Sequence, residues 1–131
     1  MIRKWFGIAS LTAIAVFLLN TSGCARDQKL VSVSLSPSQG FVFEGFNAAG
    51  QFTAYGSYIH PPENKDISNQ VTWSLNIQNF GTVSQAGLVT YTRNDGCGKG
   101  DVSATFKNSD GSVIVGTAPV SGANEGSAAC Q

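Results

Sequence analysis

Few side chains in this sequence are suited to catalysis. His60 is the single histidine among 131 residues, and the chain has three cysteines and many serines. Pro61 and Pro62 follow His60 and predict an extended, exposed loop. A serine–histidine–aspartate site needs a positioned base and an oxyanion hole, and the sequence contains no Gly-x-Ser-x-Gly elbow. We therefore expect no enzyme activity, no catalytic residue and no cofactor.

Oxygen-bearing side chains gather in one segment, at Asn94, Asp95 and Asp101 around Gly96. Calcium takes roughly six to eight oxygen ligands, so this loop is a conceivable calcium site. The spacing matches no EF-hand loop, however, and glycine-rich turns favour asparagine and aspartate without any ion. The sequence predicts a structural turn here, and we assign no metal site.

Aromatic and large apolar side chains gather near the first strands, at Phe41, Phe43, Phe46, Tyr55, Tyr58 and Ile59. Tyr55 falls on the polar phase of its predicted strand, and Tyr58 is expected to begin a loop. An exposed patch of this kind could stack on sugar rings or bind a partner protein. The alternative is that these rings are partly buried against a neighbouring loop.

The first 23 residues have the pattern of a secretory signal peptide. Arg3 and Lys4 precede an apolar run from Trp5 to Leu19. Fifteen helical residues span about 22 Å, less than the roughly 30 Å hydrocarbon core of a bilayer. Cleavage is therefore expected rather than a permanent transmembrane helix.

The end of this segment, Thr21-Ser22-Gly23-Cys24, resembles the lipobox of bacterial lipoproteins. Thr21 departs from the leucine usual at that position. The resemblance implies that Cys24 becomes the acylated first residue of the mature protein. Ala25 differs from the aspartate of the inner-membrane retention signal, which implies the outer membrane. The alternative is ordinary cleavage, with Cys24 in that position by chance.

The remaining cysteines, Cys97 and Cys130, then form an even pair in an oxidising compartment, and we predict a disulfide between them. They lie at the same end of a predicted hairpin that turns at 108–111. Closing a loop of this length should contribute about 3–4 kcal/mol. Two free thiols, or a bridge between two copies of the chain, are the alternatives.

The rest of the chain has the period-two apolar alternation of β-strands, separated by turn residues. Core-facing residues are predicted at Val31, Val33 and Leu35, at Phe52 and Ala54, at Val71, Trp73 and Leu75, and at Val102, Ala104 and Phe106. We find no amphipathic helical run. About seven to eight short strands with one apolar face predict an all-β fold, an antiparallel sandwich of two sheets.

The runs VSVSLSP (31–37), QFTAYG (51–56), VTWS (71–74), TVSQAGLVT (82–90) and GDVSAT (100–105) together resemble a bacterial immunoglobulin-like domain of group 2. The chain departs from this family by carrying one copy only and an insertion-like loop at 59–65. The resemblance implies an Ig-like sandwich in an envelope protein that acts as a spacer, adhesion or binding module. Trp73 is expected to fill the core between the sheets.

These observations divide the chain into a signal peptide (1–23), a lipidated cysteine and short tether (24–28), an Ig-like sandwich (29–121) and a C-terminal tail (122–131). Eight basic and eight acidic side chains give a formal net charge of zero, which argues against nucleic acid as a partner. We expect a non-enzymatic, lipid-anchored protein of the bacterial envelope that acts in structure, protein interaction or adhesion. The alternative is a carbohydrate-binding module that uses Tyr55 and Tyr58.

Overall fold

A computed structural model describes residues 28–94 and 96–124, and these residues form ten β-strands and no helix. The first sheet has the strand order β1 (Lys29–Ser36), β4 (Thr53–Ile59), β5 (Glu63–Asp66). The second has the order β2 (Phe41–Glu44), β10 (Val113–Ala123), β9 (Cys97–Lys107), β6 (Thr72–Leu75). The third has the order β3 (Ala49–Gln51), β8 (Leu88–Tyr91), β7 (Gly81–Val83). The all-β prediction is confirmed, and among these residues no helix is long and apolar enough to cross a membrane.

The ten strands exceed the expected seven to eight for two reasons. The run from Ala49 to Ile59 is divided at Phe52, so that β3 pairs with β8 and β4 pairs with β1. The segment expected to be an insertion-like loop instead contains β5, which pairs antiparallel with β4. His60, Pro61 and Pro62 therefore form the turn of a β4–β5 hairpin rather than part of an extended loop.

The expectation of purely antiparallel pairing is wrong at one place, since β2 runs parallel to β10 over its whole length. The chain leaves the first sheet after β1 and passes to the second through a turn in which Gly40 N–H donates to Pro37 O. Antiparallel neighbours usually arise from a hairpin return, whereas β2 and β10 come from opposite ends of the domain. The same pairing carries β10 to Ala123, two residues into the predicted C-terminal tail.

The face of β1 that enters the core differs from the predicted one at its first residues. The register of β1 against β4 shifts between Leu30 and Ser32. As a result Leu30 is 1% exposed and Val31 is 46% exposed, although Val33 and Leu35 are buried as predicted. A bulge of this kind adds one residue to a strand and reverses the side-chain alternation beyond it.

The core confirms five of the other predicted inward positions, whereas Val71, Leu75 and Phe106 are only partly buried and pack against its edge. Phe52, Ala54, Trp73, Val102 and Ala104 are all buried. An aromatic cluster lies beside them: the ring of Tyr91 stacks on Phe43 at a centroid distance of 6.3 Å and meets Phe80 edge-on at 4.9 Å. The turn at 108–111 is also confirmed, because Gly111 N–H donates to Asn108 O, with Gly111 at φ +85°.

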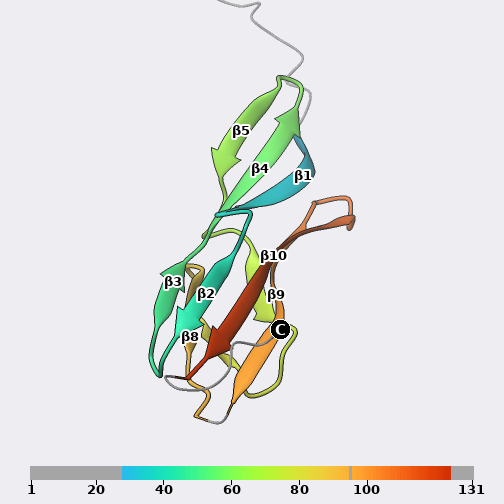
Figure 1. The fold of residues 1–131 in the computed structure, drawn as a ribbon. Helices are drawn as coiled ribbons and strands as arrows, with labels where there is room; N and C mark the ends of the chain where they lie inside the picture. Colours follow the sequence, from blue (N-terminus) through green and yellow to red (C-terminus); the bar gives the residue numbers. More distant parts are fainter. Residues whose placement is uncertain (1–27, 95, 125–131) are drawn as a thin grey trace, which may run out of the picture.

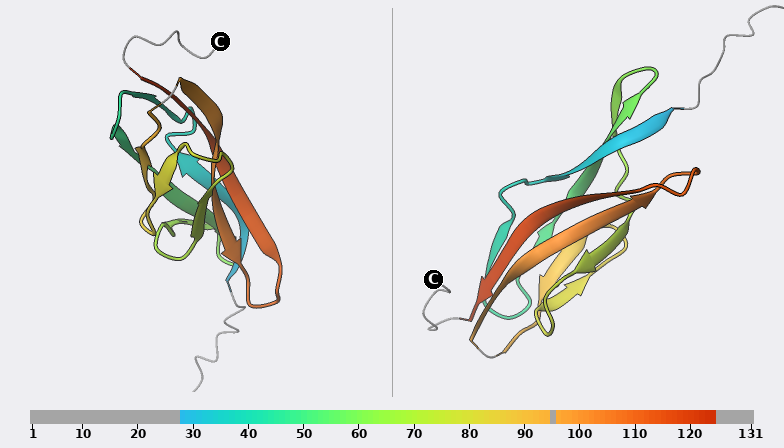
Figure 2. Two further views of the ribbon diagram at one scale, coloured as in Figure 1. Left: turned by 90° about the horizontal axis from the view of Figure 1, so that it is seen from below. Right: turned by 90° about the vertical axis from the view of Figure 1, so that its right-hand side faces the viewer.

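The molecule is elongated, with β5 and most of β1 and β4 toward one end and β2, β3, β8 and the ends of β9 and β10 toward the other (Figure 1). The β4–β5 hairpin and the start of β1 lie at one end (Figure 2). The turn between β9 and β10 points toward this same end, whereas β10 runs to the opposite end and finishes there (Figure 2). We call the end with the β4–β5 hairpin and the start of β1 the N-terminal end.

Candidate functional site

The N-terminal end is held together by three polar side chains that are not among the predicted site residues. Gln28 Nε2 donates to Glu63 Oε2 at 2.9 Å and to Pro61 O at 3.4 Å. Lys65 Nζ donates to Gln28 Oε1 at 2.7 Å and lies 3.2 Å from Glu63 Oε2. The hydrogen bond from Gln28, followed by that from Lys65, lowers the pKa of Glu63. The residue before β1 is thereby fastened to the tip of the β4–β5 hairpin.

The β9–β10 turn is joined to the start of β1 in a similar way. Lys29 Nζ lies 3.2 Å from Asp110 Oδ2, and Asn108 Nδ2 donates to Leu30 O at 3.4 Å. Asp110 also accepts hydrogen bonds from the Ser112 hydroxyl at 2.6 Å and backbone N–H at 2.8 Å. These two bonds, with the further contact from Lys29, lower the pKa of Asp110 to about 2. Two hairpins therefore meet the first residues of the domain.

His60 lies exposed in the β4–β5 turn with a positive φ of 62°. The structure describes no hydrogen bond between its imidazole and another described side chain. Pro61 and Pro62, which follow it, are also exposed. The three residues form an exposed tip whose chemistry is mainly apolar.

Tyr55 and Tyr58, predicted as a ligand surface, do not lie on one surface. They are three positions apart on β4, and alternate residues of a strand face opposite sides. Tyr55 is 42% exposed, as expected. Tyr58 belongs to the strand rather than beginning a loop, and its ring packs against the core beside Gly56, with Lys65 Nζ at 5.2 Å from its centroid. Of the two rings in the carbohydrate-binding alternative, only that of Tyr55 is well exposed.

The expected aromatic patch is also divided between the surface and the core. Phe43 is 3% exposed and belongs to the aromatic cluster. Phe41 is half-buried and meets Phe52 edge-on at 4.9 Å. Phe46, by contrast, is 54% exposed and lies in the turn between β2 and β3.

Trp73 is held by a hydrogen-bonded turn as well as by packing. Its Nε1 donates to Ser68 O at 2.9 Å. Ser68 Oγ donates to Asp66 Oδ1 at 2.6 Å and accepts from Ala54 N–H at 2.9 Å. The hydrogen bonds from Ser68 lower the pKa of Asp66. The turn after β5 therefore connects the first sheet to the indole on β6.

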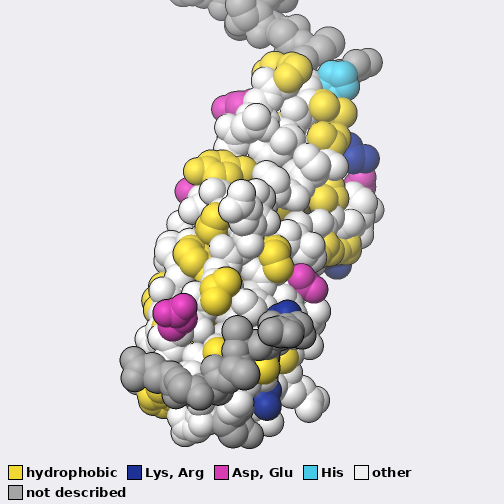
Figure 3. Space-filling model, in the orientation of Figure 1, with side chains coloured by type: hydrophobic (Ala, Val, Ile, Leu, Met, Phe, Trp, Pro, Cys, Tyr) yellow, Lys and Arg dark blue, Asp and Glu magenta, His cyan; other side chains and the backbone are white. Residues whose placement is uncertain are grey.

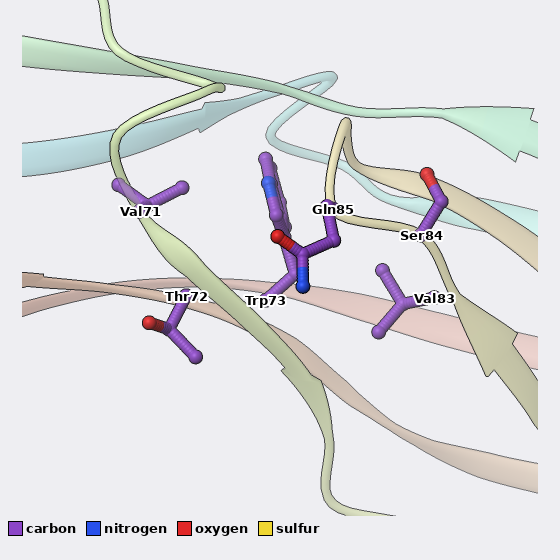
Figure 4. A pocket seen from close by; sticks show the side chains of 6 residues that line it. All are labelled: Val71, Thr72, Trp73, Val83, Ser84 and Gln85. Carbon is purple, nitrogen blue, oxygen red and sulfur yellow. The ribbon is translucent and has the colours of Figure 1, made fainter.

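A small cavity opens beside this indole, between β6 and the turn that links β7 to β8 (Figure 4). Its volume is about 110 Å³, and its lining comprises Val71, Thr72, Trp73, Val83, Ser84 and Gln85. The Gln85 side chain lies next to the indole at the mouth (Figure 4). Ligand sites usually measure roughly 300–1,000 Å³, so this space suits a few water molecules rather than an organic ligand.

Asn94 and Asp101 do not belong to one loop. Asp101 lies inside β9 opposite Pro119, and its backbone N–H and carboxylate bond to the side chain of Asn76. Asn94 lies before that strand, and Asp95 is outside the described residues. Across 28–94 and 96–124, no cluster of three or more histidine, cysteine, aspartate or glutamate side chains could hold a metal ion.

The three cysteines are only partly within the described structure. Cys97 is half-buried at the start of β9, where it pairs with Ala123, the last residue of β10. Cys24 and Cys130 lie outside the described residues. The lipidation of Cys24 and the disulfide between Cys97 and Cys130 therefore stay predictions.

A scan against protein-family models matched no family, and a search of curated proteins found none with significant similarity to this chain.

Proposed function

We propose that this chain is a non-enzymatic Ig-like module of the bacterial cell envelope, anchored through acylated Cys24 to the outer membrane. It would act as a structural element or in contacts with other envelope proteins. The observation that carries the proposal is the arrangement of the two ends. Gln28, the first described residue after the predicted lipid attachment site, is fastened to one end of an elongated domain, and β10 finishes at the other.

The topology supports an Ig-like sandwich. Only Phe52 separates β3 from β4, so these two strands can be treated as one. One layer then contains the strands β1, β4–β3, β8 and β7, with β5 added at its end. The second sheet is then the opposite layer. Ring contacts bridge the two, since Phe41 on β2 meets Phe52, and Phe43 on β2 stacks on Tyr91 of β8. On this basis the first two strands belong to different layers, β1 to one and β2 to the other.

The opposite end supports the predicted disulfide between Cys97 and Cys130. Cys97 pairs with Ala123, so the chain that continues toward Cys130 leaves the sheet directly beside it. A bridge would fasten the tail to β9 and would suit an oxidising compartment outside the cytoplasm.

The anchor is tested by expressing the full chain in a bacterial host with labelled palmitate and separating the membranes on a density gradient. We expect the parent protein to incorporate label and to fractionate with the outer membrane. The Cys24→Ala variant should take up no label and remain soluble or accumulate as the precursor. A Thr21→Leu variant is the matched control, since it introduces the residue usual in a lipobox and should stay lipidated. Unlabelled parent protein, or a processed Cys24→Ala variant that still follows the membrane, would refute the proposal.

A further inference from the structure

We infer that the tip of the β4–β5 hairpin, Ile59–Pro62, rests on the lipid surface and fixes the orientation of the domain on the membrane. This inference rests on the proposed acylation of Cys24. It goes further in assigning one surface of the domain to the bilayer.

The short chain between Cys24 and the domain limits how far the domain can lie from the membrane. From Cys24 to Gln28 the backbone can extend at most about 14 Å, at roughly 3.3–3.6 Å per residue. The headgroup region on one side of a bilayer takes up about 5–7 Å of that distance. Gln28 must therefore lie within several ångströms of the lipid surface, however the intervening residues are arranged.

Gln28 is also hydrogen-bonded to the β4–β5 hairpin. Its side chain contacts Pro61 O, Glu63 and Lys65, which places the tip beside the point where the tether begins. A domain joined to its anchor only by a loose chain could present any face to the membrane. Here three hydrogen bonds keep the tip and the tether together, so that both approach the surface at once.

The tip is also apolar enough to rest on lipid. Pro61 and Pro62 are exposed, and Ile59 is half-exposed. Apolar side chains are visible at this end next to the histidine (Figure 3). Glu63 and Lys65 are paired with each other, so no excess positive charge is directed at anionic lipids. The contact should therefore be shallow and largely independent of salt.

A neighbouring protein is the other occupant that an apolar tip could have. The short tether favours lipid, because a partner would have to fit between the tip and the headgroups. The β9–β10 turn, bonded to Lys29 through Asp110, lies toward the same end and would limit how far the domain can tilt. Phe46, in the turn between β2 and β3, would then be held away from the membrane.

The test uses the lipidated full-chain product in vesicles of phosphatidylcholine and phosphatidylglycerol with brominated acyl chains, which quench nearby tryptophan. One variant is Pro62→Trp, and the matched control is Phe46→Trp, also at an exposed turn position. Buried Trp73 is a common background in both. We expect the brominated lipid to quench the fluorescence of the added tryptophan in Pro62→Trp but not in Phe46→Trp. The quenching should be the same at low and high salt.

A second measurement needs no substitution. Isotope-labelled parent protein in nanodiscs with a gadolinium-chelating headgroup lipid should lose the amide signals of His60 and Glu63 but retain those of Phe46 and Asn47. If the parent protein is not bound to the vesicles at all, the proposed anchor fails. If it is bound, but quenching and broadening are equal at the two ends or greater at Phe46, the anchor stands and the inference is wrong. The inference would also be wrong, in favour of a protein partner, if the amide signals of the tip changed only after a second protein was added.

Discussion

Replacing Trp73 should remove a large part of the stability of this domain. The indole is 9% exposed, and a buried tryptophan replaced by alanine usually costs about 3–5 kcal/mol. The cavity of about 110 Å³ beside the ring already opens to solvent. Water can therefore enter the space that Trp73→Ala creates, and we expect the lower part of this range, about 3 kcal/mol. A typical domain has only about 5–15 kcal/mol of stability in total.

A second substitution separates packing from hydrogen bonding. Trp73→Phe keeps an aromatic ring but removes the Nε1–H that donates to Ser68 O at 2.9 Å. Leaving a shielded carbonyl without its donor costs about 1–3 kcal/mol. Trp73→Phe should therefore be destabilised, but less than Trp73→Ala.

Urea unfolding followed by far-ultraviolet circular dichroism measures both effects, since this signal comes mainly from the backbone and is present in each variant. With a slope of about 1.5 kcal/mol per molar urea, the midpoint of Trp73→Ala should fall by about 2 M. Thr72→Ala, at the exposed neighbouring position, is the control and should change stability by less than about 0.5 kcal/mol. A Trp73→Ala midpoint close to that of the control would refute the assignment of this residue to the core. A Trp73→Phe midpoint equal to the parent's would show that the hydrogen bond contributes nothing.

Three further predictions concern the disulfide, one carboxylate and two turns. Intact-mass analysis after alkylation without reductant should find Cys97 and Cys130 unmodified in a monomer, whereas two modified thiols or a covalent dimer would exclude the bridge. The pKa of Asp110 is lowered from 3.8 to about 2, chiefly by the neighbouring serine, so its contribution to stability is present above pH 4 and is lost as the pH falls toward 2. An acid titration should show a smaller loss for Asp110→Asn, and an identical acid limb would contradict this. Gly87→Ala should lower the urea midpoint more than Gly111→Ala, although both glycines have positive φ. A Cβ added at Gly87 would lie 2.6 Å from a backbone oxygen, whereas one added at Gly111 meets nothing within 4 Å. Equal shifts of the midpoint would refute this steric explanation.

Much of the local structure could be predicted from the sequence, because the alternation of apolar and polar residues is a local property of a strand. This alternation predicts that Phe52, Ala54, Trp73, Val102 and Ala104 face the core, and all five are buried. The turn at 108–111 was predictable for a similar reason, since its glycine supplies the positive φ that other residues adopt at a cost.

The candidate site was much less predictable, because its residues interact across long distances in the chain. Gln28 is a single polar residue before the first strand, and nothing near it in sequence indicates that it will bond to Glu63 and Lys65. Recognising that the segment after His60 forms a strand would have placed Glu63 and Lys65 on one side of it. The proline pair instead indicated an extended loop.

Local sequence patterns are therefore enough to predict that the chain forms strands, which face of most strands is apolar, and the turn at 108–111. How those strands combine depends on the tertiary structure. It divides one run at Phe52 between two sheets, pairs β2 parallel to β10, and shifts β1 so that Leu30 rather than Val31 is buried. The physical reason is that hydrogen bonding between strands is satisfied equally well by many partners and registers. The choice among them depends on which side chains the opposite layer can accommodate, and that information is spread over the whole chain.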